Sequence, residues 1–133
     1  MDDKGFTMVE LLIVMAVLLI LLGISIPTYT VFRDKARETA TEMEMLSLAK
    51  ALELYNTDNQ AYPVTDNYPD ALIVGNYIKS VSLRDAWNGT YEYTCRNGAS
   101  YVLESFGLNR RDGGNDDIVF YNGSLIESGA YQN

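Results

Sequence analysis

The sequence contains no histidine, so the commonest general base and the commonest transition-metal ligand are both missing. Its acids show no catalytic spacing and no nucleophile elbow occurs, so we expect no enzyme activity. The single cysteine, Cys95, has no partner for an internal disulfide, and we interpret it as a small buried hydrophobic residue. Basic residues are scarce, with ten Lys and Arg against eighteen Asp and Glu, for a net charge of −8. Because no basic cluster exists to displace counterions from phosphates, we expect no contact with nucleic acid.

Polar residues are almost missing from residues 6–26, where Thr7, Glu10 and Ser25 are the exceptions. At a rise of about 1.5 Å per residue, this run is long enough to cross a hydrocarbon core of about 30 Å. No small-residue cleavage site of the A-x-A kind follows it, so the run is not typical of a secretory signal peptide. We therefore predict a single transmembrane helix over residues 6–28.

The basic residues that flank this run give a conflicting indication of its orientation. Arg33, Lys35 and Arg37 follow it, whereas only Lys4 precedes it. A simple positive-inside count therefore places the C-terminal side in the cytoplasm. The junction motif at the start of the run implies the opposite orientation, and we follow the motif.

A short polar leader, residues 1–5, directly precedes the apolar run, and residues 5–10 read GFTMVE. This junction resembles the leader junction of type IV pilins and type II secretion pseudopilins. The resemblance implies that prepilin peptidase cleaves between Gly5 and Phe6 and that the new Phe6 amine is N-methylated. It also implies that Glu10 acts in assembly. A carboxylate inside a membrane helix costs roughly 2.5–3.5 kcal/mol, so it needs a partner, here the Phe6 amine of another copy.

Glu10 also has an alternative interpretation that involves only its own helix. Thr7 and Glu10 have the spacing of a capping box, in which each side chain accepts from the backbone of the other at a helix start. Further along, Gly23 and Pro27 weaken the helix, because glycine is flexible and proline removes a hydrogen bond. The resemblance implies that the helix unwinds locally between these two positions on assembly.

Residues 29–56 contain no glycine or proline, and we predict that they continue the helix as an amphipathic segment. One face is apolar, with a narrow stripe in the earlier turns and a wider one later. The stripe consists of Ala36, Ala40, Met43, Met45, Leu48, Leu52 and Tyr55. Charged residues fill the other face, among them Arg37, Glu38, Glu42, Glu44, Lys50 and Glu53. The turn-forming residues 56–59 are expected to end the helix.

Residues 57–133 are predicted to form a globular domain with a C-terminal antiparallel sheet. Two Asn-Gly pairs, Asn97-Gly98 and Asn122-Gly123, each lie between strand-like runs and indicate hairpins. The runs are residues 91–94 with 101–104, and residues 118–121 with 124–126. The expected fold class is α+β, with one long N-terminal helix packed on a small antiparallel sheet.

Residues 85–93, DAWNGTYEY, narrow the resemblance to the major pseudopilins of type II secretion. They are similar to that branch's Asp-Pro-Trp-Gly-x-x-Tyr-x-Tyr motif. The matching residues are Asp85, Trp87, Tyr91 and Tyr93, whereas Ala86 replaces the proline and Asn88-Gly89 replaces the immediate glycine. We interpret the tryptophan and the tyrosines as core and strand residues, so the motif indicates ancestry more than chemistry.

Residues 105–118, SFGLNRRDGGNDDI, resemble the calcium-binding stretch of the same branch. Calcium takes six to eight oxygen ligands, and glycines let a chain curl around it. The ligands implied are the Phe106 backbone carbonyl, Asn109, Asp112, Asp116 and Asp117. Asn109 stands where the branch has an aspartate, which should weaken binding. The alternative from the residues alone is an acidic, solvated turn.

The resemblance implies a structural function, as the major pseudopilin of a type II secretion system that polymerises through its N-terminal helix to drive protein export. Its partners would be copies of itself, prepilin peptidase, the inner-membrane assembly platform and minor pseudopilins. It would cross the bacterial inner membrane once, with its C-terminal domain in the periplasm, before joining a periplasmic filament. The alternative is a fibre subunit of a surface type IV pilus, for adhesion, twitching motility or DNA uptake.

Overall fold

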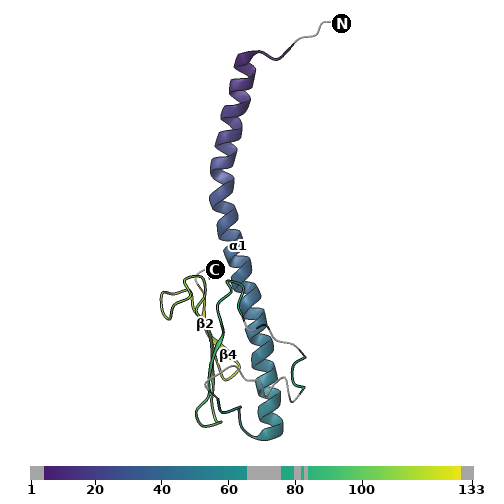
Figure 1. Cartoon of the computed structure of the whole chain (residues 1–133), viewed down its shortest axis with the longest axis vertical. Helices are drawn as coiled ribbons and strands as arrows, with labels where there is room; N and C mark the ends of the chain where they lie inside the picture. The colour runs from purple at the N-terminus through teal and green to yellow at the C-terminus, as the bar shows by residue number, and fades with distance from the viewer. Residues whose placement is uncertain (1–4, 66–75, 80–81, 83, 130–133) are drawn as a thin grey trace. The chain divides into compact units, whose positions relative to one another are not determined.

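The computed structural model of the chain describes residues 5–65, 76–79, 82 and 84–129. One long helix, α1, is followed in the chain by four strands (Figure 1). Their bounds are α1 Met8–Asn59, β1 Glu92–Thr94, β2 Val102–Ser105, β3 Ile118–Tyr121 and β4 Ser124–Ser128. The predicted α+β class is confirmed, with one long N-terminal helix and a small antiparallel sheet.

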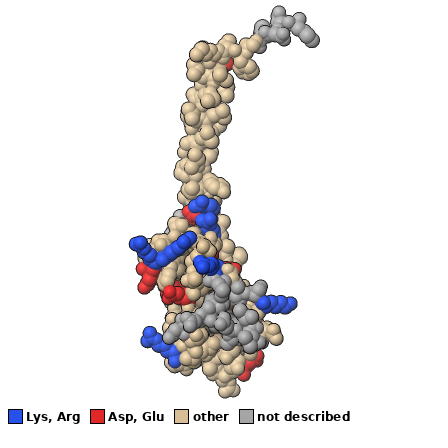
Figure 2. All heavy atoms as spheres, in the orientation of Figure 1, with Lys and Arg blue, Asp and Glu red and all other residues tan. Residues whose placement is uncertain are grey.

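The chain divides into two compact units, one ending at Asp34 and the other beginning at Lys35. In the first unit, the N-terminal part of α1 is long and apolar enough to cross a membrane, judged by length and composition. Its large hydrophobic side chains are exposed along the whole segment, and Figure 2 shows its surface almost without charge. The apolar helix predicted over residues 6–28 is therefore present, although it begins at Met8 instead of Phe6.

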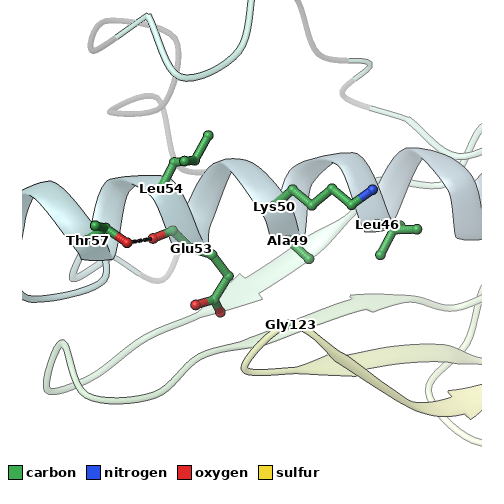
Figure 3. Close-up of a pocket in the computed structure, with 7 residues that line it drawn as sticks. All are labelled: Leu46, Ala49, Lys50, Glu53, Leu54, Thr57 and Gly123. Carbon is green, nitrogen blue, oxygen red and sulfur yellow. Dashed lines mark hydrogen bonds between the residues drawn. The ribbon is translucent and has the colours of Figure 1, made fainter.

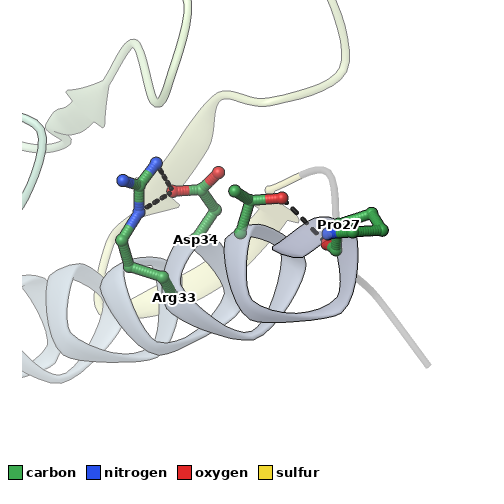
Figure 4. Close-up of polar contacts among 4 residues, drawn as sticks. Pro27, Arg33 and Asp34 are labelled. Atoms are coloured by element: carbon green, nitrogen blue, oxygen red, sulfur yellow. Dashed lines mark hydrogen bonds and ion pairs between the residues drawn. The ribbon is translucent and has the colours of Figure 1, made fainter. Parts of the chain in front are cut away.

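Pro27 lies inside α1 without ending it (Figure 4). Proline has no N–H to donate, so one backbone hydrogen bond of the helix is lost at this point. Nearby hydroxyls donate to backbone carbonyls of the same turns: Ser25 to Leu21 at 2.8 Å, Thr28 to Ile24 at 3.0 Å and Thr30 to Pro27 at 2.8 Å. Six residues after the proline, Arg33 and Asp34 form an ion pair at 3.1 Å (Figure 4). The segment is helical in the single chain, and its unwinding on assembly stays a prediction.

The later turns of α1 contribute the predicted apolar face to the core of the second unit. Met45, Leu48 and Leu52 are buried, and Tyr55 packs against the same cluster. Ala49 and Ala51 of the helix belong to the same core. Its other buried members come from beyond the helix and are Tyr62, Trp87, Tyr91, Tyr93, Cys95, Tyr101, Leu103, Ile118 and Phe120. The structural interpretation of Trp87 and the tyrosines is therefore confirmed, and so is the buried position of Cys95.

The prediction for the earlier turns of α1 was wrong. Ala36, Ala40 and Met43 are exposed, with Met43 at 64 % of its full accessible area. The buried residues are Glu38 and Thr41, which lie seven and four positions before Met45 and so fall on the same helical face. The helix keeps one buried face throughout the second unit, but that face changes from polar to apolar along its length.

Three acids assigned to the charged face accept hydrogen bonds from the rest of the domain. The hydroxyls of Ser128, Tyr91 and Tyr62 donate to Glu42 at 2.5 Å, Glu44 at 2.7 Å and Glu53 at 2.8 Å, in that order. Bonds to charged groups are stronger than neutral ones, at about 1.5–3 kcal/mol each. These acids therefore connect the helix to the sheet and to the segment after the helix.

The helix ends three residues later than predicted, at Asn59 instead of residue 56. Two of the expected turn-formers bond back to the helix, because Thr57 donates to the Glu53 carbonyl at 2.9 Å and Asn59 to the Tyr55 carbonyl at 3.0 Å. The helix then stops at Gln60, whose φ of 58° is left-handed.

The four strands form one antiparallel sheet in the order β1-β2-β3-β4. Both predicted hairpins are confirmed, since β1 pairs with β2 and β3 pairs with β4. In the second hairpin, Asn122 and Gly123 both have positive φ, at 45° and 78°, as a type I′ turn requires. The pairing of β2 with β3 aligns Glu104 with Val119, and this register positions the acidic site described below.

Candidate functional site

The Gly5–Phe6 junction lies immediately before the first turn of α1 and outside the helix. Gly5 is the first described residue, so residues 1–4 of the predicted leader lie outside the described part of the chain. Phe6 is 84 % exposed, and the region around Gly5 is open. A non-helical, accessible peptide bond is the kind of substrate that a peptidase can bind.

Thr7 and Glu10 form a capping box at the start of α1. The backbone N–H and the hydroxyl of Thr7 donate to Glu10 Oε2 at 2.8 and 2.7 Å, and the Glu10 N–H donates to the Thr7 hydroxyl at 3.2 Å. In the single chain, Glu10 therefore forms the helix cap that the alternative interpretation predicted. A cap in the single chain does not exclude a second partner in a filament, so the assembly role of Glu10 stays a prediction.

Asp85 organises the turn formed by the Asp-Ala-Trp-Asn-Gly stretch. Its Oδ1 accepts hydrogen bonds from the backbone N–H groups of Trp87 at 2.9 Å and Gly89 at 2.7 Å. Its Oδ2 accepts from the Ser105 hydroxyl at 2.7 Å. A Cβ atom at position 89 would lie 2.8 Å from the same carboxylate, which explains the glycine. The residues of this motif therefore stabilise the fold, as the sequence interpretation indicated.

The acidic loop between β2 and β3 gathers three carboxylates. Oxygen atoms of Glu104, Asp112 and Asp117 lie within 4.8 Å of one another. Asp112 and Asp117 were predicted as ligands, whereas Glu104 was not. Glu104 lies in β2, outside the loop, and only the β2–β3 pairing brings it close. An acid in the middle of a strand was the one sequence signal that could have indicated it.

Asp117 and Glu104 are in unfavourable surroundings for negative charge. Asp117 is only 3 % exposed, and although its Oδ2 accepts from the Gly113 N–H at 2.7 Å, its Oδ1 has no hydrogen-bond partner among the described residues. Partial burial raises the pKa of Glu104, and the negative charges of Asp112 and Asp117 raise it further. Both observations indicate a position where a cation would be stabilised.

The other predicted ligands are placed differently. The backbone N–H of Asn109 donates to Asp116 Oδ2 at 2.7 Å, and its side-chain amide donates to Asp116 Oδ1 and to the Gly113 carbonyl. The Phe106 carbonyl accepts from the Arg110 N–H at 3.1 Å. The structure therefore pairs Asn109 with Asp116, and Asp116 is not one of the three carboxylates that lie close together.

The residues of this loop fit a calcium ion in their chemistry. Carboxylate oxygens are hard ligands of the kind that calcium prefers. Asp117, one of the three residues, also has a buried Oδ1 without a hydrogen-bond partner among the described residues. The calcium prediction itself stays untested.

A shallow groove also lies along α1 in the second unit, between the helix and the β3–β4 turn (Figure 3). Its lining consists of Leu46, Ala49, Lys50, Glu53, Leu54, Thr57 and Gly123. Glu53 already accepts the hydrogen bond from Tyr62, which leaves Lys50 as the other charged group of the lining. This mainly aliphatic surface offers no set of groups for catalysis.

Two family models match the chain. The model described as type II secretion system (T2SS), protein G, matches residues 29–121, and the model described as prokaryotic N-terminal methylation motif matches residues 1–26. No solved structure matches.

Several curated relatives share the name type II secretion system core protein G. The Pseudomonas aeruginosa protein is 30 % identical over 130 residues, which cover 87 % of this chain and 91 % of the relative. The Escherichia coli K12 protein is 27 % identical over 131 residues, covering 88 % and 90 %. The Vibrio cholerae protein is 30 % identical over 103 residues, covering 68 % and 70 %. This chain therefore belongs to the type II secretion system protein G family.

Proposed function

We propose that this chain is the major pseudopilin of a type II secretion system and polymerises through the apolar half of α1 into a filament that drives protein export. The observation that carries the proposal is the exposed apolar surface along the N-terminal part of α1, which directly follows the Gly5–Phe6 junction. Such a surface requires either lipid or other apolar helices around it. Membrane anchoring satisfies it before assembly, and neighbouring copies satisfy it afterwards.

The proposed sequence of events begins with the precursor in the bacterial inner membrane, its C-terminal domain in the periplasm. Prepilin peptidase removes the leader, and the Phe6 amine becomes available and is methylated. The assembly platform and minor pseudopilins then receive the subunit, and Glu10 of one copy pairs with the Phe6 amine of the next. Pairing two charges in a lipid environment lowers the cost that each has alone.

The acidic loop is proposed to bind one calcium ion that stabilises the globular domain. The predicted ligands are the Phe106 carbonyl, Asn109, Asp112, Asp116 and Asp117. The support for a cation is that the Asp112 and Asp117 carboxylates lie close together and that Asp117 Oδ1 is buried without a partner among the described residues. A metal that binds only the folded state stabilises it by about 2.7 kcal/mol at one hundred times its dissociation constant.

The function is tested by deleting the gene in its own host. Proteins that normally leave the cell through the secretion channel should then accumulate in the periplasm, and the wild-type gene should restore export. Cross-linking of membranes from restored cells should give a ladder of multiples of the mature chain. If deletion instead removes surface fibres or twitching and leaves export intact, the chain is a type IV pilus subunit and the proposal is wrong.

A further inference from the structure

We propose that Glu104 of strand β2 joins Asp112 and Asp117 as a carboxylate ligand of the cation, and that Asn109 and Asp116 form a brace that shapes the loop. This inference rests on the proposed calcium site. Compared with the ligands predicted from the sequence, this inference adds Glu104, which lies outside the loop. It removes Asn109 and Asp116, which lie within the loop.

The distances are consistent with a single ion. Calcium lies about 2.3–2.6 Å from each oxygen ligand, so two oxygens on the same ion are separated by at most about 5.2 Å. The oxygens of Glu104, Asp112 and Asp117 lie within 4.8 Å of one another. The three come from β2, the loop and the residue just before β3, so they approach the same point from different directions.

The three neighbouring carboxylates also need a positively charged partner. In the described part of the chain, no Lys or Arg side chain forms an ion pair with any of the three carboxylates. Independently of the cluster, Asp117 is 3 % exposed and its Oδ1 has no hydrogen-bond partner among the described residues. A buried polar atom without a partner is rare in folded proteins, and a cation bound between the three carboxylates would satisfy it.

Asn109 and Asp116 already satisfy each other. Both carboxylate oxygens of Asp116 accept N–H groups of Asn109, while Oδ1 of the Asn109 side chain accepts the Arg111 backbone N–H at 2.5 Å. An aspartate at position 109 has no side-chain N–H and would set one carboxylate against another. The asparagine therefore suits a brace. The negative charge that an aspartate at position 109 would bring to the ion is instead supplied by Glu104 and Asp112.

Close packing supports the brace as a structural element. Gly107 has a φ of +56°, and a Cβ atom there would collide with the Asp116 carbonyl oxygen. Asp116 is itself buried. Gly107, Asn109 and Asp116 thus help to hold the shape of the loop, and none of them belongs to the group of carboxylates that faces the proposed ion.

The test is calcium titration calorimetry on the full chain in detergent micelles, after removal of metal with a chelator. The wild type should bind one calcium ion per chain, and Glu104→Gln should weaken binding at least tenfold. Glu92→Gln and Glu127→Gln are the matched controls, because they remove the same charge from strands β1 and β4. Each should weaken binding less than threefold. Circular dichroism of every variant establishes that it is folded.

Asn109→Asp provides a second, independent comparison. If residue 109 were a ligand, the added charge would tighten binding, whereas in a brace it should leave the affinity unchanged or lower. Wild-type affinity in Glu104→Gln, or tenfold tighter binding in Asn109→Asp, overturns this inference and leaves the calcium proposal standing. No calcium binding by the wild type overturns the calcium proposal itself, and this inference with it.

Discussion

The side-chain hydroxyl of Ser105 donates a 2.7 Å hydrogen bond to Oδ2 of Asp85, and both residues are buried. This contact joins strand β2 to a turn that lies 20 residues earlier in the chain. Asp85 also accepts the N–H groups of Trp87 and Gly89. One buried carboxylate therefore holds both the shape of the turn and its position against the sheet.

Replacing Asp85 by alanine should lower the free energy of unfolding by about 3 kcal/mol, because three donors lose their acceptor. Urea unfolding followed by circular dichroism measures the change. Glu127→Ala removes an exposed acid from β4 and should alter stability by less than about 0.5 kcal/mol. Equal effects of the two substitutions would show that Asp85 does not organise the turn.

The mature chain should begin at Phe6. The Gly5–Phe6 bond is exposed and lies outside the helix, where a peptidase can reach it. Intact-mass analysis of protein from membranes should show loss of residues 1–5 and the addition of one methyl group. A mature protein that keeps these residues, or one that is cut after Ser25, would contradict the assignment.

Glu10→Ala should enter the membrane as well as the wild type but fail to join filaments. Thr7→Ala is the matched variant, because it breaks the same capping box and keeps the carboxylate. Losing the cap should cost each variant about 1 kcal/mol of helix stability. Cross-linking at equal membrane abundance should show polymers for Thr7→Ala and none for Glu10→Ala. If both polymerise equally, Glu10 is a helix cap only.

Removing calcium should lower the melting temperature of the globular domain, because the ion binds only the folded loop. Thermal melts in millimolar calcium and in chelator provide the comparison. Asp117→Ala should abolish most of the difference. Magnesium should give little stabilisation, since its octahedral geometry suits an irregular loop poorly. If the wild-type melting temperature is the same in calcium and in chelator, the loop is only an acidic turn.

Stability should fall at alkaline pH because buried tyrosines must lose a proton. Burial, with the hydrogen bond to Glu53 and its charge, raises the pKa of Tyr62 from its usual 10 to about 12. Burial also raises the pKa of Tyr93 and of Tyr101. The unfolded chain releases these protons first, so the contribution is complete below pH 10 and is lost as the pH rises through about 12.

Unfolding free energies measured from about pH 8 upward should show this decline. Tyr62→Phe should make this decline shallower. At neutral pH the substitution should lower the free energy of unfolding by about 1.5–3 kcal/mol, because the bond to the charged Glu53 is lost. Tyr29→Phe, at an exposed position, is the control and should leave the slope unchanged. A slope that is the same in Tyr62→Phe and in the wild type would contradict the role of Tyr62.

Local patterns in the sequence were sufficient for much of this protein. The Gly5–Phe6 junction and the two Asn-Gly hairpins each depend on neighbours within about ten residues of the chain, and the apolar run is one continuous segment of the sequence. Their physical causes, which are helix length, hydropathy and turn geometry, act over the same short range. The family resemblance rests on short motifs of the same kind, so the order of residues along the chain is enough to show it.

Only the tertiary structure decided which polar residues are buried and which acids meet. Glu38 was assigned to the charged face of the helix, yet the orientation of the helix relative to the core buries it, together with Thr41. Glu104 approaches Asp117 because β2 pairs with β3 in one register, and a shift of one residue would turn its side chain to the other face. Spacing along the chain carries no information on that register, so the sequence by itself determined the elements, and their packing determined the acidic site.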